Sequence, residues 1–320
     1  GKVAQLPDIP LSASSLSPLI ADIPINFVPP ASYEPIDNYG YFGFNNSNHG
    51  VGDAQTYLNL DNATGQALCL PSDYGEVAQK WTMGWWFTGD QFNIGGLLNR
   101  KFFFGTQTGT SENITLAAVY DPPGNYLGLL PDPTSIASGE RGMQVGVIQD
   151  IGVGWDSDLV FDAWLWDGDA GGDKCQVYRT HIEGWKQNPD WGTDYTPDGW
   201  WNHFAVKYDG TATGSPFSLI RDGAIIYEMN PLPQFTTTTD IAPQWPAGSS
   251  RWTIGSWMRS TDASVDARGQ ICDFFLYDGL MDGGTLYQLG SDITKDAYGR
   301  RHGGVKDLLV NDPNSRILLP

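Results

Sequence analysis

Two Asp-Gly dipeptides divide the chain between residues 201 and 227 into short runs of strand-forming residues. The first run, Trp201 to Tyr208, is rich in aromatic and β-branched side chains and ends at Asp209-Gly210. The second dipeptide, Asp222-Gly223, stands between two apolar runs, which is the strongest local signal for a β-hairpin with a type I′ turn. This region therefore predicts antiparallel strands joined by tight turns.

The rest of the chain continues this pattern. Its 320 residues include 39 glycines and 21 prolines, so turn signals recur at short intervals, and no long stretch places apolar residues at helical spacing. All-β folds often use about 200 to 250 residues for a single core. We therefore expect one all-β domain with extensions at its ends and little helix.

The same residues resemble the laminin-G-like branch of the concanavalin A-like lectin and glucanase superfamily. The matching positions are Trp201, His203, Ala205, Tyr208-Asp209-Gly210, Asp222-Gly223 and Gly269-x-Ile271-x-Asp273. Upstream, residues 57–60 and 81–87 are similar to the opening strands of that family, so the resemblance covers roughly residues 54 to 290. It implies a two-sheet antiparallel jelly-roll sandwich of the concanavalin A-like type.

The chain departs from the family in the strand that contains Gly269 and Asp273. Cys272 and Phe275 stand where the family usually has a polar or charged residue, so we expect this outer surface to be buried. Members of the family often have a short helix after this strand. Residues 282–289 predict such a helix here, with Asp282 as its N-cap.

Three segments follow from this interpretation. Residues 1–50 are predicted to be a proline-rich extended arm and a loop, with 37–50 leading into the sandwich, because proline disrupts helices and central strands alike. Residues 51–290 are the predicted laminin-G-like jelly-roll sandwich, and 291–320 are a C-terminal tail whose apolar end we expect to be buried. The arm lies either on its own sandwich or on a neighbouring subunit, and the sequence leaves both arrangements open.

The chain is strongly acidic, with a net charge of −19 and only 18 basic residues, which form no run. This argues against nucleic acid and anionic membranes as partners. The acidity is typical of a solvated surface, and cation binding is the alternative. Three widely spaced cysteines, Cys69, Cys175 and Cys272, give no disulfide framework. No secretory signal is visible, so we expect synthesis without secretion unless the chain is a trimmed mature form.

The predicted strands carry no recognisable catalytic motif. Glycoside hydrolases of this superfamily have two carboxylates on one strand, typically as Glu-x-Asp-x-x-Glu, because retaining chemistry needs them about 5 Å apart. This chain has no such motif and no serine in a Gly-x-Ser-x-Gly sequence. His203 has the best functional claim among the histidines, but its counterpart in the family is mostly structural. The sequence therefore predicts a protein that is not an enzyme.

An acidic run offers oxygen ligands for a metal ion, and its members are Asp156, Asp158, Asp162, Asp167, Asp169 and Asp173. Hard oxygen ligands on a flexible, glycine-rich loop are those that Ca²⁺ takes, and laminin-G-like domains often carry Ca²⁺ at one rim. We expect Asp167, Asp169 and Asp173 to be the ligands, with a solvated acidic turn as the alternative.

Three tryptophans, Trp155, Trp164 and Trp166, stand near this run. On a strand Trp164 and Trp166 would point to the same side, and such a pair could stack on a sugar ring. The three residues are therefore candidates for carbohydrate binding. Aromatic pairs also fill the cores of sandwiches, so burial is the competing interpretation.

Together these features predict a non-catalytic virion protein of a tailed phage, of the capsid decoration, head-fibre or tail-fibre type. It would be made in the host cytoplasm, assemble as a homo-oligomer, a trimer by our estimate, and contact other virion proteins and host surface glycans. The assignment is an analogy, because laminin-G-like modules recur in such proteins and fold does not fix function. A secreted carbohydrate-binding module or a divergent glycoside hydrolase, located outside the cell, is the alternative.

Overall fold

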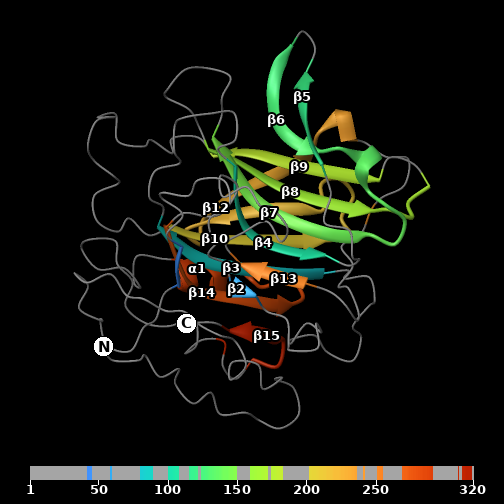
Figure 1. Cartoon of the computed structure of the whole chain (residues 1–320). Helices are drawn as coiled ribbons and strands as arrows, with labels where there is room; N and C mark the ends of the chain where they lie inside the picture. The colour runs from blue at the N-terminus through green and yellow to red at the C-terminus, as the bar shows by residue number, and fades with distance from the viewer. Residues whose placement is uncertain are drawn as a thin grey trace, which may run out of the picture.

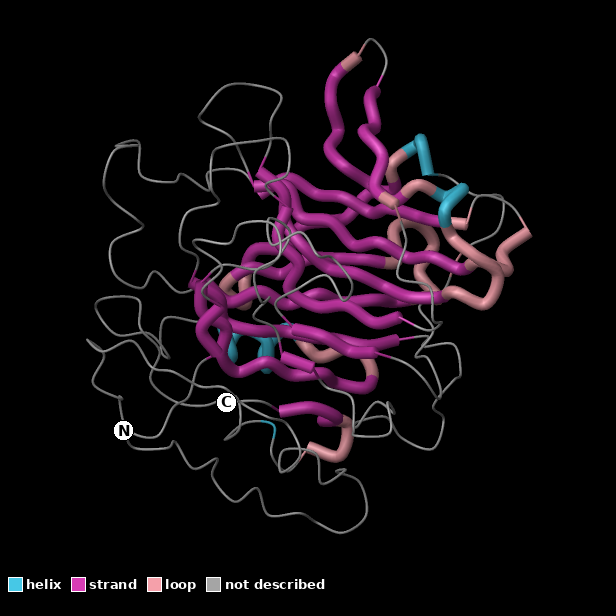
Figure 2. The backbone as a smooth tube through the Cα atoms, in the orientation of Figure 1, coloured by secondary structure: helices cyan, strands magenta, loops and turns pink. Residues whose placement is uncertain are grey.

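Strands dominate the structure, and its helical segments are few and short (Figures 1 and 2). None of the described helices combines the length and the apolar character that a membrane crossing needs. The computed structural model describes residues 42–44, 58–59, 80–88, 100–107, 115–121, 124–149, 159–171, 174–182, 202–235, 241, 251–254, 269–290, 309 and 312–318.

Thirteen strands form one antiparallel ladder that folds over on itself, with β15 (Ser315–Leu318) pairing with β14 beside the main path. The order along that path is β1 (Phe42–Phe44), β14 (Gly269–Asp278), β3 (Lys80–Thr88), β10 (Asn202–Asp209), β11 (Phe217–Arg221), β12 (Ile225–Pro231), β9 (Cys175–Ile182), β8 (Leu159–Asp167), β7 (Arg141–Gln149), β4 (Arg100–Gln107), β13 (Arg251–Ile254) and β2 (Leu58–Asn59).

β12 joins the two layers of this ladder. Its residues 225–229 pair with β11, and Asn230 and Pro231 pair with β9. We call the layer from β1 to β11, with β15, sheet A, and the layer from β9 to β2 sheet B. The predicted fold class, an all-β, two-sheet antiparallel jelly-roll sandwich, is therefore confirmed.

An aromatic cluster centred on Trp85 of β3 fills the space between the sheets. Its ring centroid lies 5.2 Å from that of Phe103 and 6.3 Å from that of Phe161, both in sheet B. Within sheet A, the rings of Phe204 and Phe274 lie 6.3 and 6.4 Å away. All five side chains are at most 1% exposed. Rings at these separations bury large apolar areas, so this cluster is the main source of cohesion between the layers.

The predicted hairpin is also confirmed. Asp222 and Gly223 have φ angles of 50° and 72°, the left-handed values that a type I′ turn needs at both central positions. The N–H of Ala224 donates to the carbonyl of Arg221 over 3.1 Å. The ladder resumes with Ile225 opposite Arg221, so three residues connect the paired strand ends instead of the two of a simple type I′ hairpin.

The outer face of sheet A is covered by α1 (Gly283–Gly290). Asp282 is its N-cap as predicted, because one of its carboxylate oxygens accepts the N–H of Thr285 at 2.9 Å. Phe275 is fully buried, as its departure from the family pattern implies. It belongs to an apolar cluster with Ala205, Ile220, Met281, Leu286, Leu289 and Leu309.

Two segments near the ends of the chain lie along the outer edge of β14. The sequence predicts a loop over 37–50, but Phe42–Phe44 pairs with residues 269–271, because a strand edge offers N–H and C=O groups to any extended segment. β15 pairs with residues 275–277, so the C-terminal end adds a strand to this edge, and the burial of its apolar side chains stays a prediction. The three-segment division stays a prediction, and 1–36 lie outside the described residues.

Candidate functional site

A two-stranded hairpin covers part of the outer face of sheet B. β5 (Leu116–Asp121) and β6 (Asn125–Pro131) pair with each other and with no other described strand. Figure 1 shows the hairpin rising beyond the edge of the sandwich, above β9 and β8. The hairpin is therefore held on the sandwich by side chains rather than by a continuous sheet.

Trp164 and Trp166 lie beneath this cover, on β8. They share one face of the strand, as predicted, but Trp164 is fully buried and Trp166 is 2% exposed. Neither ring is open to a sugar, because the hairpin and two short 3-10 helices, η2 (Pro133–Ser135) and η3 (Pro233–Phe235), flank that face. Both side chains belong to the core of the molecule, in agreement with the alternative interpretation that they are buried. Trp155 lies outside the described residues. Their buried neighbours are Leu130, Ile136, Cys175, Val177 and Phe235.

A buried ion pair lies in the same layer. Asp162 of β8 and Arg179 of β9 are opposite each other in register. Arg179 donates twice to the Asp162 carboxylate, with Nε to Oδ1 at 2.6 Å and Nη2 to Oδ2 at 2.8 Å. Its Nη1 donates to the carbonyl of Leu127 in β6 at 2.8 Å. One guanidinium thus joins two strands of sheet B to β6 of the hairpin, at its bulge, with charge-assisted hydrogen bonds.

Asp162 belongs to the acidic run that the sequence shows, whereas Arg179 is not among the residues predicted from it. Both side chains are nearly inaccessible, at 0% and 8% exposure. The signal that could have found them is the position of each charge within a strand that is otherwise mostly apolar, since buried charges are nearly always paired.

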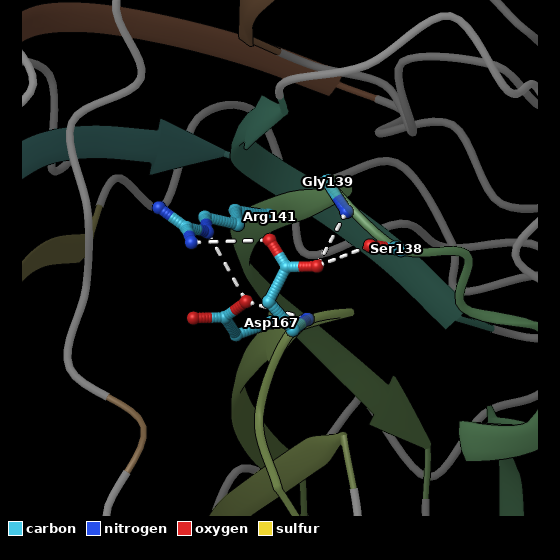
Figure 3. A network of polar contacts seen from close by, with 5 residues as sticks. Ser138, Gly139, Arg141 and Asp167 are labelled. Atoms are coloured by element: carbon cyan, nitrogen blue, oxygen red, sulfur yellow. Dashed lines mark hydrogen bonds and ion pairs between the residues drawn. The ribbon is translucent and has the colours of Figure 1, made fainter.

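Two of the three predicted calcium ligands meet an arginine at the rim of sheet B, as Figure 3 shows. Arg141 Nε lies 3.1 Å from Asp167 Oδ1, and its Nη2 lies 3.2 Å from Asp169 Oδ2. The other oxygen of Asp169 accepts the hydroxyl of Ser138 and, at 3.0 Å, the N–H of Gly139. The backbone N–H of Asp169 donates to Asp167 Oδ1 at 2.9 Å. All of these contacts join residues 138–141 to residues 167–169 or lie within the second of these segments.

The electrostatics of this rim explain its structure. The hydrogen bond from Ser138, the N–H of Gly139 and the charge of Arg141 hold the pKa of Asp169 below its ordinary value. A guanidinium already lies between the two carboxylates, where a divalent cation would be repelled. Within the described part of the chain, no group of three or more His, Cys, Asp or Glu side chains could hold a metal ion. Asp173 lies outside that part. The arrangement fits a salt-bridged turn better than a calcium site.

The rim loop of residues 132–140 packs tightly on the turn after β8. Gly168 allows this approach, because a Cβ at that position would lie 1.6 Å from the carbonyl oxygen of Ala137. The N–H of Gly168 donates to the carbonyl of Glu140 at 2.7 Å, and Lys174 Nζ donates to the carbonyl of Ile136 at 2.8 Å. These contacts fix the rim at the base of the hairpin.

The outer part of the hairpin presents an aromatic side chain. Tyr120 of β5 is 56% exposed and stands opposite Tyr126 of β6 in register. Gly124 in the connection has a φ of 121°, a value that favours glycine. This hairpin is not among the elements predicted above, although Pro122-Pro123-Gly124 is a turn signal between two strand-forming runs.

His203 has a structural position. Its side chain is 1% exposed, and its ring lies 5.3 Å from that of Trp86 and 6.2 Å from that of Phe275, nearly parallel to the latter. A histidine enclosed by aromatic rings on the covered face of sheet A has no access to a substrate. This agrees with the structural role that the family resemblance implies for this position.

Comparisons with known proteins add little to this description. No protein-family model matches the chain, and no curated protein matches it. Among solved structures it is similar to the native heptameric SAP-like pentraxin from Limulus polyphemus, with 11% sequence identity, 79% of this chain and 88% of that chain covered, and a TM-score of 0.35. The fold assignment therefore rests on the strand pairings and the core of this chain.

Proposed function

We propose that the protein is a non-catalytic recognition protein whose β5–β6 hairpin contacts glycans on a surface. The observation that carries this proposal is the hairpin itself, which rises from the sandwich, is anchored through β6 and presents Tyr120 to solvent. A tyrosine offers a flat apolar face and a hydroxyl on a side chain with few rotatable bonds, so it gains contact area at a low entropic cost.

The contact between Arg179 and β6 keeps Tyr120 in a fixed position for binding. An isolated two-stranded hairpin is marginally stable in water, so Tyr120 is presented in a fixed place only if the hairpin is held on the sandwich. The contact from Arg179 to the carbonyl of Leu127 supplies that restraint, and the apolar side chains of Leu116 and Val119 add packing. A fixed aromatic group loses less freedom on binding than a mobile one.

The setting we propose is a virion, where the chain is a capsid decoration, head-fibre or tail-fibre protein and binds other virion proteins. Support comes from the laminin-G-like sequence pattern and its recurrence in such proteins, which is an analogy of fold. Mass spectrometry of purified particles tests it, because the chain must be present in stoichiometric amount. A secreted carbohydrate-binding module would use the same hairpin, and finding the chain only in the medium would favour it.

Binding to a panel of immobilised glycans tests the recognition role, followed by calorimetry on each hit. Tyr120→Ala should weaken binding about tenfold, which corresponds to about 1.4 kcal/mol. The matched control is Tyr287→Ala, because Tyr287 is 52% exposed but lies on α1. Loss of binding in the control alone, equal binding by both variants, or no glycan hit at all would contradict the proposal. Release of sugar from any hit would replace it with the hydrolase alternative.

A further inference from the structure

The end of the β11–β12 hairpin exposes two adjacent isoleucines. Ile226 is 72% exposed and Ile225 is 47% exposed. Ile226 continues a row on the outer face of sheet A, where it stands opposite Ile220, which is 3% exposed beneath α1. The apolar surface therefore extends beyond the element that covers it.

The backbone beside these residues is a strand edge. On the side away from β11, β12 pairs with β9 only at Asn230 and Pro231. Continuing that register would place Ile182, the last residue of β9, opposite Tyr227, so Ile225 and Ile226 extend past the end of β9. Within the described residues, 225–229 have no strand partner on this side.

Strand alternation tells which backbone groups face that edge. Leu232 N–H donates to the carbonyl of Val177 on β9 at 2.8 Å. Because successive residues of a strand direct their N–H and C=O groups to opposite sides, those of Glu228 and Ile226 face the same way as those of Leu232. Ile226 thus combines an exposed apolar side chain with outward backbone donor and acceptor groups, which is a template for another strand.

The edge is also held rigidly. The side chain of Asp222 accepts the N–H of His203 at 2.9 Å, and the N–H of Asp222 donates to the carbonyl of His203 at 2.8 Å. Gly223 touches α1 so closely that a Cβ there would lie 2.4 Å from the carbonyl oxygen of Leu286. A strand end fixed on two sides loses little conformational entropy when a partner adds to it.

We propose that a second copy of this chain adds to this edge as an antiparallel strand, with a two-fold axis at Ile226. In this register Ile226 faces its own symmetry mate, and Ile225 faces Tyr227 of the other copy. Glu228 then stands opposite Ala224 rather than opposite a second glutamate. An axis at Glu228 would set two like charges against each other, which is destabilising.

Charge and size define the kind of dimer. Each copy carries −19, so the copies repel each other and salt should strengthen the contact by screening. A pairing of so few residues buries less than the roughly 1,200 Å² of a stable interface, so the dimer is weak and depends on concentration. A two-fold contact gives a dimer, whereas the expectation from the sequence is a trimer.

Sedimentation velocity of the full chain from about 10 μM to about 1 mM, at ionic strengths of about 0.02 M and about 0.5 M, tests this. We expect a monomer–dimer equilibrium that shifts toward dimer in high salt. Ile226→Lys should raise the dimer Kd at least about tenfold. Ile226→Pro should do the same, because it removes an outward N–H without breaking the β11 ladder. Tyr120→Lys makes the same change of charge on the β5–β6 hairpin and should leave the dimer unchanged.

A disulfide gives the register independently of affinity. Residues in a hydrogen-bonded antiparallel pair have Cα atoms about 5.5 Å apart, within the range that a disulfide spans. Ile226→Cys should therefore form a covalent dimer under mild oxidation, while Glu228→Cys and the parent chain should not. A monomer at every concentration, a trimer, a dimer that survives Ile226→Lys, or equal cross-linking of both cysteine variants would overturn the proposal.

Discussion

The two sheets of the sandwich have covered outer faces, but the covers are held in different ways. On sheet A, α1 packs through Leu286 and Leu289 onto an entirely apolar cluster. On sheet B, the β5–β6 hairpin packs on a cluster with two tryptophans and is tied by the buried pair of Asp162 and Arg179. A helix satisfies its own backbone hydrogen bonds, so apolar contact suffices to hold it, whereas a lone hairpin needs a directional anchor.

The largest expected effect comes from removing the anchor on sheet B. Arg179→Met leaves the carboxylate of Asp162 buried without its cation, and we expect a loss of about 3–5 kcal/mol in the free energy of unfolding. Chemical denaturation measures it. The matched control is Lys80→Met, because Lys80 and Asp209 form an ion pair with side chains 42% and 29% exposed. It should cost about 0–1 kcal/mol.

A second variant tests whether the Asp162–Arg179 pair fixes the position of the β5–β6 hairpin more than it stabilises the fold. The double change Asp162→Leu with Arg179→Met should recover part of the loss, because an apolar pair of similar size can replace a buried ion pair. Hydrogen exchange in β5 and β6 should nevertheless stay faster than in the parent, since the bond to the Leu127 carbonyl is gone. A loss in Arg179→Met no larger than in Lys80→Met would contradict the distinction between the two covers.

A smaller effect is expected where the apolar cover of sheet A has no spare volume. A Cβ at Gly84 would lie 2.5 Å from two ring atoms of Phe275 and 3.0 Å from the carbonyl oxygen of Phe204. Gly84→Ala should cost about 1–3 kcal/mol by overpacking, measured as a shift of the denaturation midpoint. Gly171→Ala is the control, since open space surrounds that position. Equal stability of both variants would show that this cover is loosely packed.

The N-cap of α1 should matter less again. Asp282→Ala should cost about 1 kcal/mol. The hydrogen bonds from Thr285 hold the pKa of Asp282 below its ordinary value, so this contribution is complete above the ordinary aspartate pKa of about 3.9. It is lost as the pH falls through the lowered folded-state pKa. Denaturation at neutral and acidic pH measures it. Asp282→Asn should retain most of the capping at both pH values, and a loss equal to that of Asp282→Ala would contradict the capping role.

The smallest effect belongs to the exposed rim of sheet B. Asp169→Asn should leave the denaturation midpoint nearly unchanged, because the ion pair with Arg141 is largely solvated. The Asp169 carboxyl should titrate in an NMR experiment below the ordinary pKa of about 3.9. Calcium or a chelator should leave the melting temperature unchanged if this is a salt-bridged turn. A rise of the melting temperature with calcium would support the calcium site that the sequence predicts.

Local signals along the chain determine much of the fold. Asp222-Gly223 sets the hairpin turn, because both residues adopt left-handed backbone angles. Asp209-Gly210 begins a second turn, in which the N–H of Ala212 donates to the carbonyl of Asp209. Alternation in residues 81–87 and 201–208 marks two central strands, and Asp282 marks the start of α1. Such features depend on neighbours within a few positions of the chain, so the sequence alone can specify them.

Tertiary structure decided what each polar and aromatic side chain does. Trp164 and Trp166 have the same spacing whether they bind sugar or fill a core, and only the cover above β8 made them interior. Asp162 and Asp169 belong to one acidic run, yet the first is paired with Arg179 inside the molecule and the second with Arg141 at its rim. The sequence by itself thus determined strands, turns and caps. Burial and charge pairing came from contacts between distant strands, because the free energy of a charge or an aromatic ring depends on what surrounds it in space.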